Sequence, residues 1–274
     1  MLELHAHTTY SDGTLSPREL VQAAAAAKVQ ALAITDHDTI AGWDEAIATA
    51  HTLPHPMEIV PGVELSVTDG ARSLHILGFY PDPDQLRPFL AERLVGRRLR
   101  AQRMVAQLTT LGYPIDESLL PSEPGTAPGR PHIAQALVAA GYIKHPQEAF
   151  DRWLGGGKAA YVSYDELSVT DGLVALKAAG AIPVWAHPYL WHSATMVEAM
   201  LPNLVAAGLM GLEVYHPTQT PAQQDRLTGL CRQWDLLKTG GSDYHGPSQA
   251  SERPLNYFGL PLGLLRSLKS RLPS

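Results

Sequence analysis

The stretch LELHAHTTYSDGT (residues 2–14) places His5 and His7 one residue apart near the start of the chain, with Asp12 close behind. LELH has the pattern of a short strand, and side chains two positions apart on a strand point to the same face. One metal ion can therefore bind both imidazoles. Whether they form a site depends on what the rest of the chain brings beside them.

Six more short apolar or β-branched runs are predicted to be strands, and helical patterns separate several of them. The first helix has a clear start, because Ser16 can cap it, Pro17 suits its first position and Glu19 completes a capping box. Alternating strands and helices predict an α/β fold with a largely parallel sheet, open or closed into a barrel. The further strands are ALAIT (31–35), EIVPGVELSV (58–67), LHILGFY (74–80), IPVWAH (182–187), GLEVYH (211–216) and LLKTGGSD (236–243).

The alternation stops between residues 82 and 160, where helical patterns and a Pro/Gly/Ser-rich linker occur without a strand pattern. These helices are short of partners and would need the barrel to bury their apolar faces. We therefore expect a helical insertion that covers one rim of the barrel, and not an independent domain. The barrel itself would consist of residues 1–81 and 161–274.

The composition narrows the class of protein. A net charge of −6 argues against stable binding to duplex nucleic acid, and 45% hydrophobic residues support a large core. The longest apolar runs are too short to span a membrane, and no basic region precedes an apolar run at the N-terminus, so we expect a cytoplasmic protein. The single cysteine, Cys231, lies in a helical pattern and is expected to be a packing residue.

Histidines and acids recur at the predicted strand ends. In a parallel β/α fold these ends share one rim, so residues distant in sequence converge there. Mixed imidazole and carboxylate ligands favour zinc, manganese or iron over calcium, and the absence of cysteine ligands argues against a structural thiolate site. The candidate metal ligands are His5, His7, Asp12, His37, Glu64, His75, His187, Asp243 and His245. The remaining histidines do not share the pattern and most are expected at the surface: His51, His55, His132, His145, His192 and His216.

The motifs that carry these residues closely resemble the successive motifs of the PHP (polymerase and histidinol phosphatase) superfamily. The resemblance runs from residue 2 to about residue 246. It implies a metal-dependent phosphoesterase on a distorted seven-stranded β/α, TIM-like barrel. The motifs are HAHTTYSDGT (5–14), ITDHDTI (34–40), PGVELS (61–66), the following His75, WAHP (185–188) and GGSDYHG (240–246).

The resemblance also implies two or three divalent ions, with manganese expected first and zinc, iron or magnesium as alternatives. One ion would be surrounded by His5, His7, Glu64 and Asp243, a second by Asp12, His37 and His245, and a third by Glu64, His75 and His187. Of these residues, Asp12 and His245 would lie beside the attacking water. Asp36 is expected to orient a ligand histidine from behind.

The helical insertion resembles the branch that removes the 3′-phosphate of nucleoside 3′,5′-bisphosphates; some relatives also trim short RNA from the 5′ end. A second phosphate requires a cationic clamp, and arginine suits bidentate phosphate binding. Histidinol phosphate phosphatase is an alternative, and a non-catalytic metal-binding regulatory module is another. Candidates for substrate contact are Arg97, Arg100, Arg103, Arg130, His132 and His216, and candidates for stacking on a base are Trp153, Tyr161, Tyr189 and Trp191.

Overall fold

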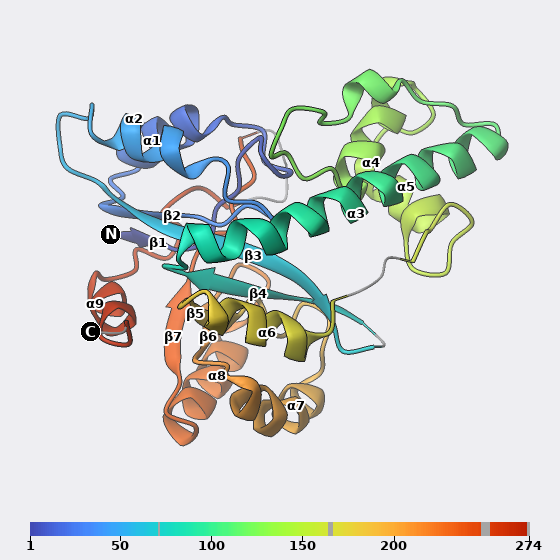
Figure 1. Cartoon of the computed structure of the whole chain (residues 1–274). Helices are drawn as coiled ribbons and strands as arrows, with labels where there is room; N and C mark the ends of the chain where they lie inside the picture. The colour runs from blue at the N-terminus through green and yellow to red at the C-terminus, as the bar shows by residue number, and fades with distance from the viewer. Residues whose placement is uncertain (71, 164–166, 248–252, 273–274) are drawn as a thin grey trace.

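The computed structural model describes residues 1–70, 72–163, 167–247 and 253–272. At its centre lies a seven-stranded sheet whose strands are neighbours in chain order (Figure 1). This result confirms the α/β class and the seven predicted strands. The strands are β1 (Leu2–Glu3), β2 (Ala31–Ile34), β3 (Glu58–Thr68), β4 (Ser73–Phe79), β5 (Ile182–Trp185), β6 (Gly211–Tyr215) and β7 (Leu237–Gly240).

The two edges of this sheet meet through the segments that follow β1 and β7. The amide of Leu4 donates to the carbonyl of Gly240 at 3.3 Å, and the amide of His7 donates to the carbonyl of Tyr244 at 2.8 Å. Gly241 permits this approach, because a Cβ at that position would lie 2.5 Å from the amide nitrogen of His5. The sheet is thus nearly closed into the distorted TIM-like barrel that was predicted.

One strand runs against the others. β4 pairs antiparallel with both β3 and β5, whereas the remaining pairs are parallel, as expected. β3 and β4 are joined by a short connection, and such a connection can join only antiparallel strands. The start of β4 therefore lies at the same rim as the ends of the parallel strands, and His75 stands near that start.

Helices cover the outside of the barrel. The N-terminus of α1 has the predicted capping box, in which the side chain of Ser16 accepts from the amide of Glu19 and the Glu19 carboxylate accepts from the amide of Ser16. Cys231 is buried in α8, as expected of a packing residue. These helices are α1 (Pro17–Ala26), α2 (Trp43–Ala50), α6 (Val169–Ala178), α7 (Ala194–Ala207), α8 (Pro221–Gln233) and α9 (Gly263–Lys269).

A long helix, α3 (Pro83–Thr110), leads from the barrel to a separate group of helices (Figure 1). This group has its own hydrophobic core, in which Ile133, Leu137 and Leu154 are fully buried. The helices beyond α3 thus bury apolar side chains against one another, whereas Leu86 and Leu90 of α3 belong to the core of the barrel. The helical insertion over residues 82–160 that depends on the barrel stays a prediction. The group contains η1 (Glu117–Leu119), α4 (Arg130–Ala139), α5 (Pro146–Ala149) and η2 (Phe150–Leu154).

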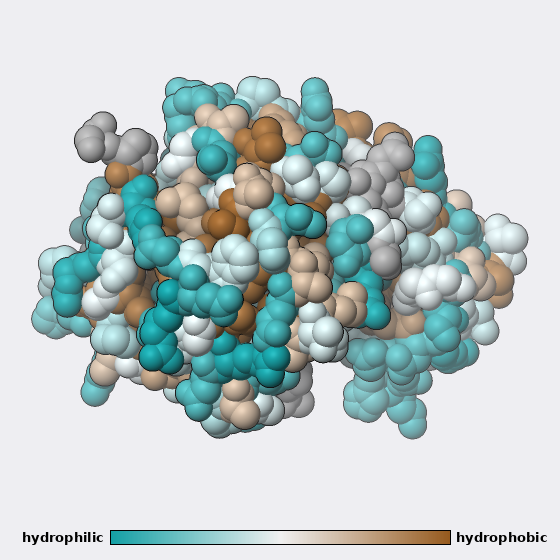
Figure 2. All heavy atoms as spheres, turned by 90° about the horizontal axis from the view of Figure 1, so that it is seen from below, coloured by the Kyte–Doolittle hydropathy of each residue, from teal (hydrophilic) through white to brown (hydrophobic). Residues whose placement is uncertain are grey.

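One face of the molecule carries mostly polar side chains. Figure 2 shows this face, on which hydrophilic side chains predominate and hydrophobic ones occur in scattered spots between them. In the described part of the chain, no helix has the length and apolar character that crossing a membrane requires.

Candidate metal centre and active site

Glu64 occupies the centre of the site. It lies in β3, its side chain is 1% exposed, and its two oxygens face five imidazoles. Oε2 lies 3.2 Å from Nε2 of His5, from Nε2 of His7 and from Nδ1 of His37. Oε1 lies 2.8 Å from Nδ1 of His75 and 3.0 Å from Nε2 of His187. One carboxylate thus connects five histidines from four separate segments of the chain, since His5 and His7 share one segment.

His5, His7 and Asp243 form one side of this cluster. Oδ1 of Asp243 lies 3.2 Å from Nε2 of His5 and 3.1 Å from Nε2 of His7. These three buried atoms have no hydrogen-bond partner among the described residues. Buried polar atoms normally have partners, so atoms that converge without any are expected where an ion binds.

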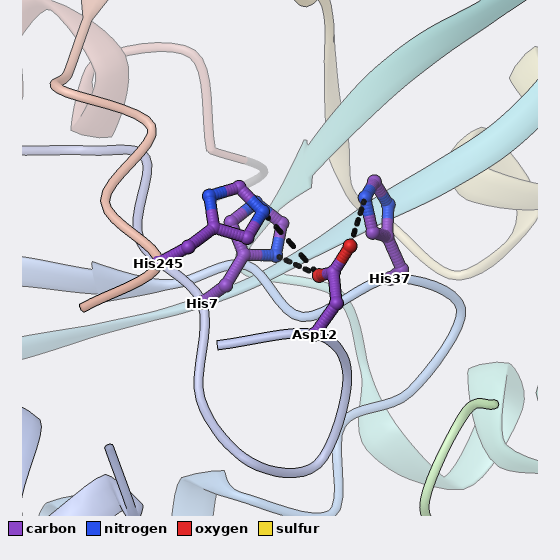
Figure 3. Close-up of side chains that lie close together, drawn as sticks. All are labelled: His7, Asp12, His37 and His245. Atoms are coloured by element: carbon purple, nitrogen blue, oxygen red, sulfur yellow. Dashed lines mark ion pairs between the residues drawn. The ribbon is translucent and has the colours of Figure 1, made fainter. Parts of the chain in front are cut away.

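Asp12 forms the other side, as Figure 3 shows. Its carboxylate lies between His37 on one side and the stacked rings of His7 and His245 on the other. Oδ1 is 3.3 Å from Nε2 of His245 and 3.7 Å from Nδ1 of His7, and Oδ2 is 3.8 Å from Nε2 of His37. Most of these distances exceed those of direct hydrogen bonds, which leaves space between the groups.

The donor atoms fall into three groups, each of which could hold a metal ion with its ligand atoms within 4.8 Å of one another. Imidazole and carboxylate donors without thiolate suit divalent transition metals. The first group equals the first set that the PHP resemblance implies. The second group contains the implied residues Asp12, His37 and His245 and, in addition, His7. The third group contains Glu64 and His75 as implied, but His37 in place of His187. The groups are His5, His7, Glu64 and Asp243; His7, Asp12, His37 and His245; and His37, Glu64 and His75.

Burial and neighbouring charges shift the pKa of several side chains in the cluster. Burial alone would lower the pKa of His7, but Asp243 and Glu64 raise it to about 10. Burial lowers the pKa of His37 to about 3. Burial opposes ionisation of Asp12, yet His37 and His245 hold the pKa of that carboxyl well below its usual range. Ionised carboxylates therefore face the space between the rings, as a cation site requires.

Residues behind the cluster hold the histidines in place. Glu213 in β6 was missed by the sequence analysis; its Oε1 lies 2.9 Å from Nδ1 of His5, and its Oε2 accepts from the amide of His187 at 2.8 Å. Asp36 was expected to orient a ligand histidine from behind. It accepts from the side chain of Ser11 at 2.6 Å, and Ser11 Oγ lies 3.3 Å from Nδ1 of His7, so Asp36 reaches this histidine through Ser11.

A cavity of about 270 Å³ opens above the cluster. Asp12, Glu64 and Asp243 line one part of it. The same cavity is lined by three arginines from α3 and the start of α4, namely Arg97, Arg100 and Arg130.

Aromatic side chains surround the arginine side. The guanidinium carbon of Arg100 lies 5.4 Å from the ring centre of Tyr161, and that of Arg130 lies 5.6 Å from the ring centre of Phe150. Such cation–π contacts limit how far the two arginines can move. Trp191 also lines the cavity, and its ring stands perpendicular to the rings of His75 and His187.

Three predicted substrate contacts stand outside the lining of this cavity. Arg103 lies in a neighbouring groove along α3. Nδ1 of His132 accepts from the amide of Gly129, which caps α4. His216 is buried, and its Nε2 lies 3.3 Å from Oδ2 of Asp243. His192 is buried as well, so the expectation of a surface position fails for these last two histidines.

Comparisons with known proteins agree with this geometry. The family model "PHP domain" matches residues 3–114. The chain is 34% identical over 254 residues to a 5′-3′ exoribonuclease of Haemophilus influenzae, which covers 89% of this chain and 90% of that protein. The chain belongs to the PHP family.

Two further relatives extend this assignment. A 3′,5′-nucleoside bisphosphate phosphatase of Chromobacterium violaceum is 33% identical to this PHP protein, over 90% of this chain and 88% of the relative. The crystal structure of a protein assigned as a metal-dependent phosphoesterase from Bifidobacterium adolescentis superposes with a TM-score of 0.87 at 33% identity, covering 100% of this chain and 96% of that one. The protein is therefore a metal-dependent phosphoesterase, and the alternative of a non-catalytic module is not supported.

Proposed function

We propose that this PHP protein hydrolyses the 3′-phosphate of nucleoside 3′,5′-bisphosphates. The observation that carries the proposal is the cavity in which Glu64, Asp12 and Asp243 face Arg97, Arg100 and Arg130. The first three belong to the donor groups for metal ions, and the arginines can bind a second phosphate. A substrate with two phosphates would use both sides of the cavity.

The nine candidate ligands hold two or three divalent ions under this proposal, manganese first, with zinc, iron and magnesium as alternatives. When bound, such ions lower the pKa of water and balance the charge of phosphoryl oxygens. Asp12 and His245 both line the cavity, and Oδ1 of Asp12 lies 3.3 Å from Nε2 of His245. Nδ1 of His245 donates to the carbonyl of Asp243 at 2.8 Å, which fixes the ring so that Nε2 points toward Asp12.

Trp191 is the residue we propose for contact with the base. It is 39% exposed at the edge of the cavity, whereas Trp153 is buried in the core of the helical group. Tyr161 lies against Arg100 and Arg130, so it supports the arginines under this proposal. An exposed indole beside a phosphate site can stack on any of the four bases.

The test compares phosphate esters in the presence of Mn²⁺. Adenosine 3′,5′-bisphosphate should give the highest kcat/KM, ahead of adenosine 3′-monophosphate and histidinol phosphate, and a chelator should abolish turnover. Arg130→Gln should raise KM for the bisphosphate. Preference for histidinol phosphate would establish the alternative, and the absence of phosphate release with Mn²⁺ bound would refute both.

A second activity, removal of nucleotides from the 5′ end of short RNA, is favoured by the groove beside the cavity. This groove has a volume of about 730 Å³, and Arg100 lines both it and the cavity. Arg103 lines the groove together with the carboxylates of Glu92 and Asp171. An RNA whose first nucleotide fills the cavity would place later phosphates near Arg103. Arg103→Gln should therefore slow cleavage of a 5′-phosphorylated pentanucleotide and leave bisphosphate hydrolysis unchanged.

A further inference from the structure

Asp38 connects the metal cluster to the arginine side of the cavity. It follows His37 directly in the loop after β2, its side chain is 0% exposed, and it lines the cavity. Oδ2 accepts from Nε of Arg97 at 2.6 Å, and Oδ1 lies 3.3 Å from Nε of Arg93. Two consecutive residues of one loop thus contact different parts of the cavity lining, since His37 faces Glu64 and Asp38 faces the arginines of α3.

The backbone at Asp38 is firmly attached to β3. Its amide donates to the carbonyl of Glu64 at 3.0 Å, and its Oδ1 accepts from the amide of Ser66 at 3.1 Å. The φ angle of Asp38 is 51°, in the left-handed region that aspartate and asparagine tolerate better than most residues. The carboxylate is therefore presented to α3 from a rigid position.

The guanidinium of Arg97 is also held at its other end. Nη2 donates to Oγ of Ser66 at 2.6 Å, so both Asp38 and β3 determine its orientation. Arg93 is buried and donates through Nη2 to the carbonyl of Ser66 at 2.8 Å. A long arginine side chain has many rotamers, and these contacts select one of them.

We propose that Asp38 is a positioning residue that fixes the distance between Arg97 and the metal cluster, and thereby selects substrates that carry a second phosphate. The inference rests on the proposed bisphosphate activity. Asp38 does not touch the reacting phosphate under this proposal; it acts through Arg97. Its loss should lower the selectivity between substrates more than the rate of hydrolysis itself.

The experiment measures kcat/KM with Mn²⁺ for adenosine 3′,5′-bisphosphate and for adenosine 3′-monophosphate, which differ only in the second phosphate. Asp38→Asn keeps the size and the tolerated backbone angle but removes the charge. We expect the preference for the bisphosphate to fall at least tenfold through a higher KM, with the monophosphate value within twofold of wild type.

Matched variants separate positioning from general damage. Arg97→Gln should lower the same ratio, and adding Asp38→Asn to it should change little more, because both act on one contact. Arg98→Gln, one position along α3 and bonded to the carbonyl of Glu123, should leave the ratio unchanged. Should Asp38→Asn fail to fold, Ser66→Ala provides the same test, with a smaller fall expected.

The outcomes distinguish the two proposals. A wild-type enzyme that does not prefer the bisphosphate overturns the proposed function. A wild-type enzyme that prefers it, together with an Asp38→Asn variant of unchanged ratio, overturns only the role of Asp38. Equal losses on both substrates would mean that Asp38 supports the fold or the cluster, and would also overturn the positioning role.

Discussion

Replacing Glu213 by glutamine tests whether the metal cluster depends on the tautomer of His5. Glu213 is fully buried, and its two oxygens face Nδ1 of His5 at 2.9 Å and the amide of His187 at 2.8 Å. A carboxylate only accepts hydrogen bonds, so His5 must carry a proton on Nδ1. Nε2 of His5, which faces Glu64 and Asp243, is then the nitrogen that would bind a metal ion.

Glutamine has nearly the same size but replaces one acceptor oxygen by an NH₂ donor. If its oxygen pairs with the amide of His187, its NH₂ faces Nδ1 of His5, and the imidazole proton moves to Nε2, where the ion would bind. In the opposite orientation of the glutamine amide, its NH₂ group would face the backbone N–H of His187, so two donors would meet there. Loss of such an outer partner costs about 10- to 100-fold in metal affinity, or roughly 1.4 to 2.7 kcal/mol.

The measurement is a Mn²⁺ titration of each folded variant by calorimetry, with competition against a chelator where binding is tight. Glu213→Gln should bind Mn²⁺ more weakly by the factor given above. The matched control is Glu198→Gln, because Glu198 forms an exposed ion pair with Arg226 at the surface and should not affect binding. Wild-type affinity in a correctly folded Glu213→Gln protein would refute the tautomer argument.

Three further predictions concern protons, packing and closure of the barrel. The pKa of His7 is about 10 without metal, so His7 is protonated at neutral pH. Mn²⁺ should therefore release protons when it binds, and it should bind more tightly as the pH rises toward that pKa. Binding heats that do not depend on the buffer would contradict this prediction. Leu137→Ala should lower the free energy of unfolding by about 2–5 kcal/mol in urea, whereas the exposed Leu119→Ala should not. Gly241→Ala should cost about 1–3 kcal/mol, and an unchanged Tm would show that the edges of the sheet can separate without loss.

The fold could be predicted from the sequence because the strands of the barrel have a strong local signal. Each is a short apolar or β-branched run, and His5, His7 and His187 mark the places where such runs end. The reversal of β4 has no such signal in the strand itself, since antiparallel and parallel strands have similar composition. The sequence analysis grouped His75 with the other candidate ligands, but only the reversed direction of β4 explains how the start of a strand reaches the rim.

The role of Glu213 behind the cluster could not be predicted, because it exists only in three dimensions. Glu213 occurs in the predicted strand GLEVYH, where nothing local distinguishes it from any polar residue of a half-exposed strand. It is fully buried because it faces His5, which lies more than 200 positions earlier. The burial of His216 against Asp243 arises in the same way.

The loop ITDHD shows how one short segment can determine the geometry of a whole site. Asp36 holds the segment that carries Ser11, His37 faces Glu64, and Asp38 faces Arg97. Because these three residues are consecutive, the distances between the first strand, the metal cluster and the long helix α3 cannot vary independently. The position of Arg97 over the cluster therefore depends on this loop as well as on the packing of α3, whose Leu86 and Leu90 belong to the core of the barrel.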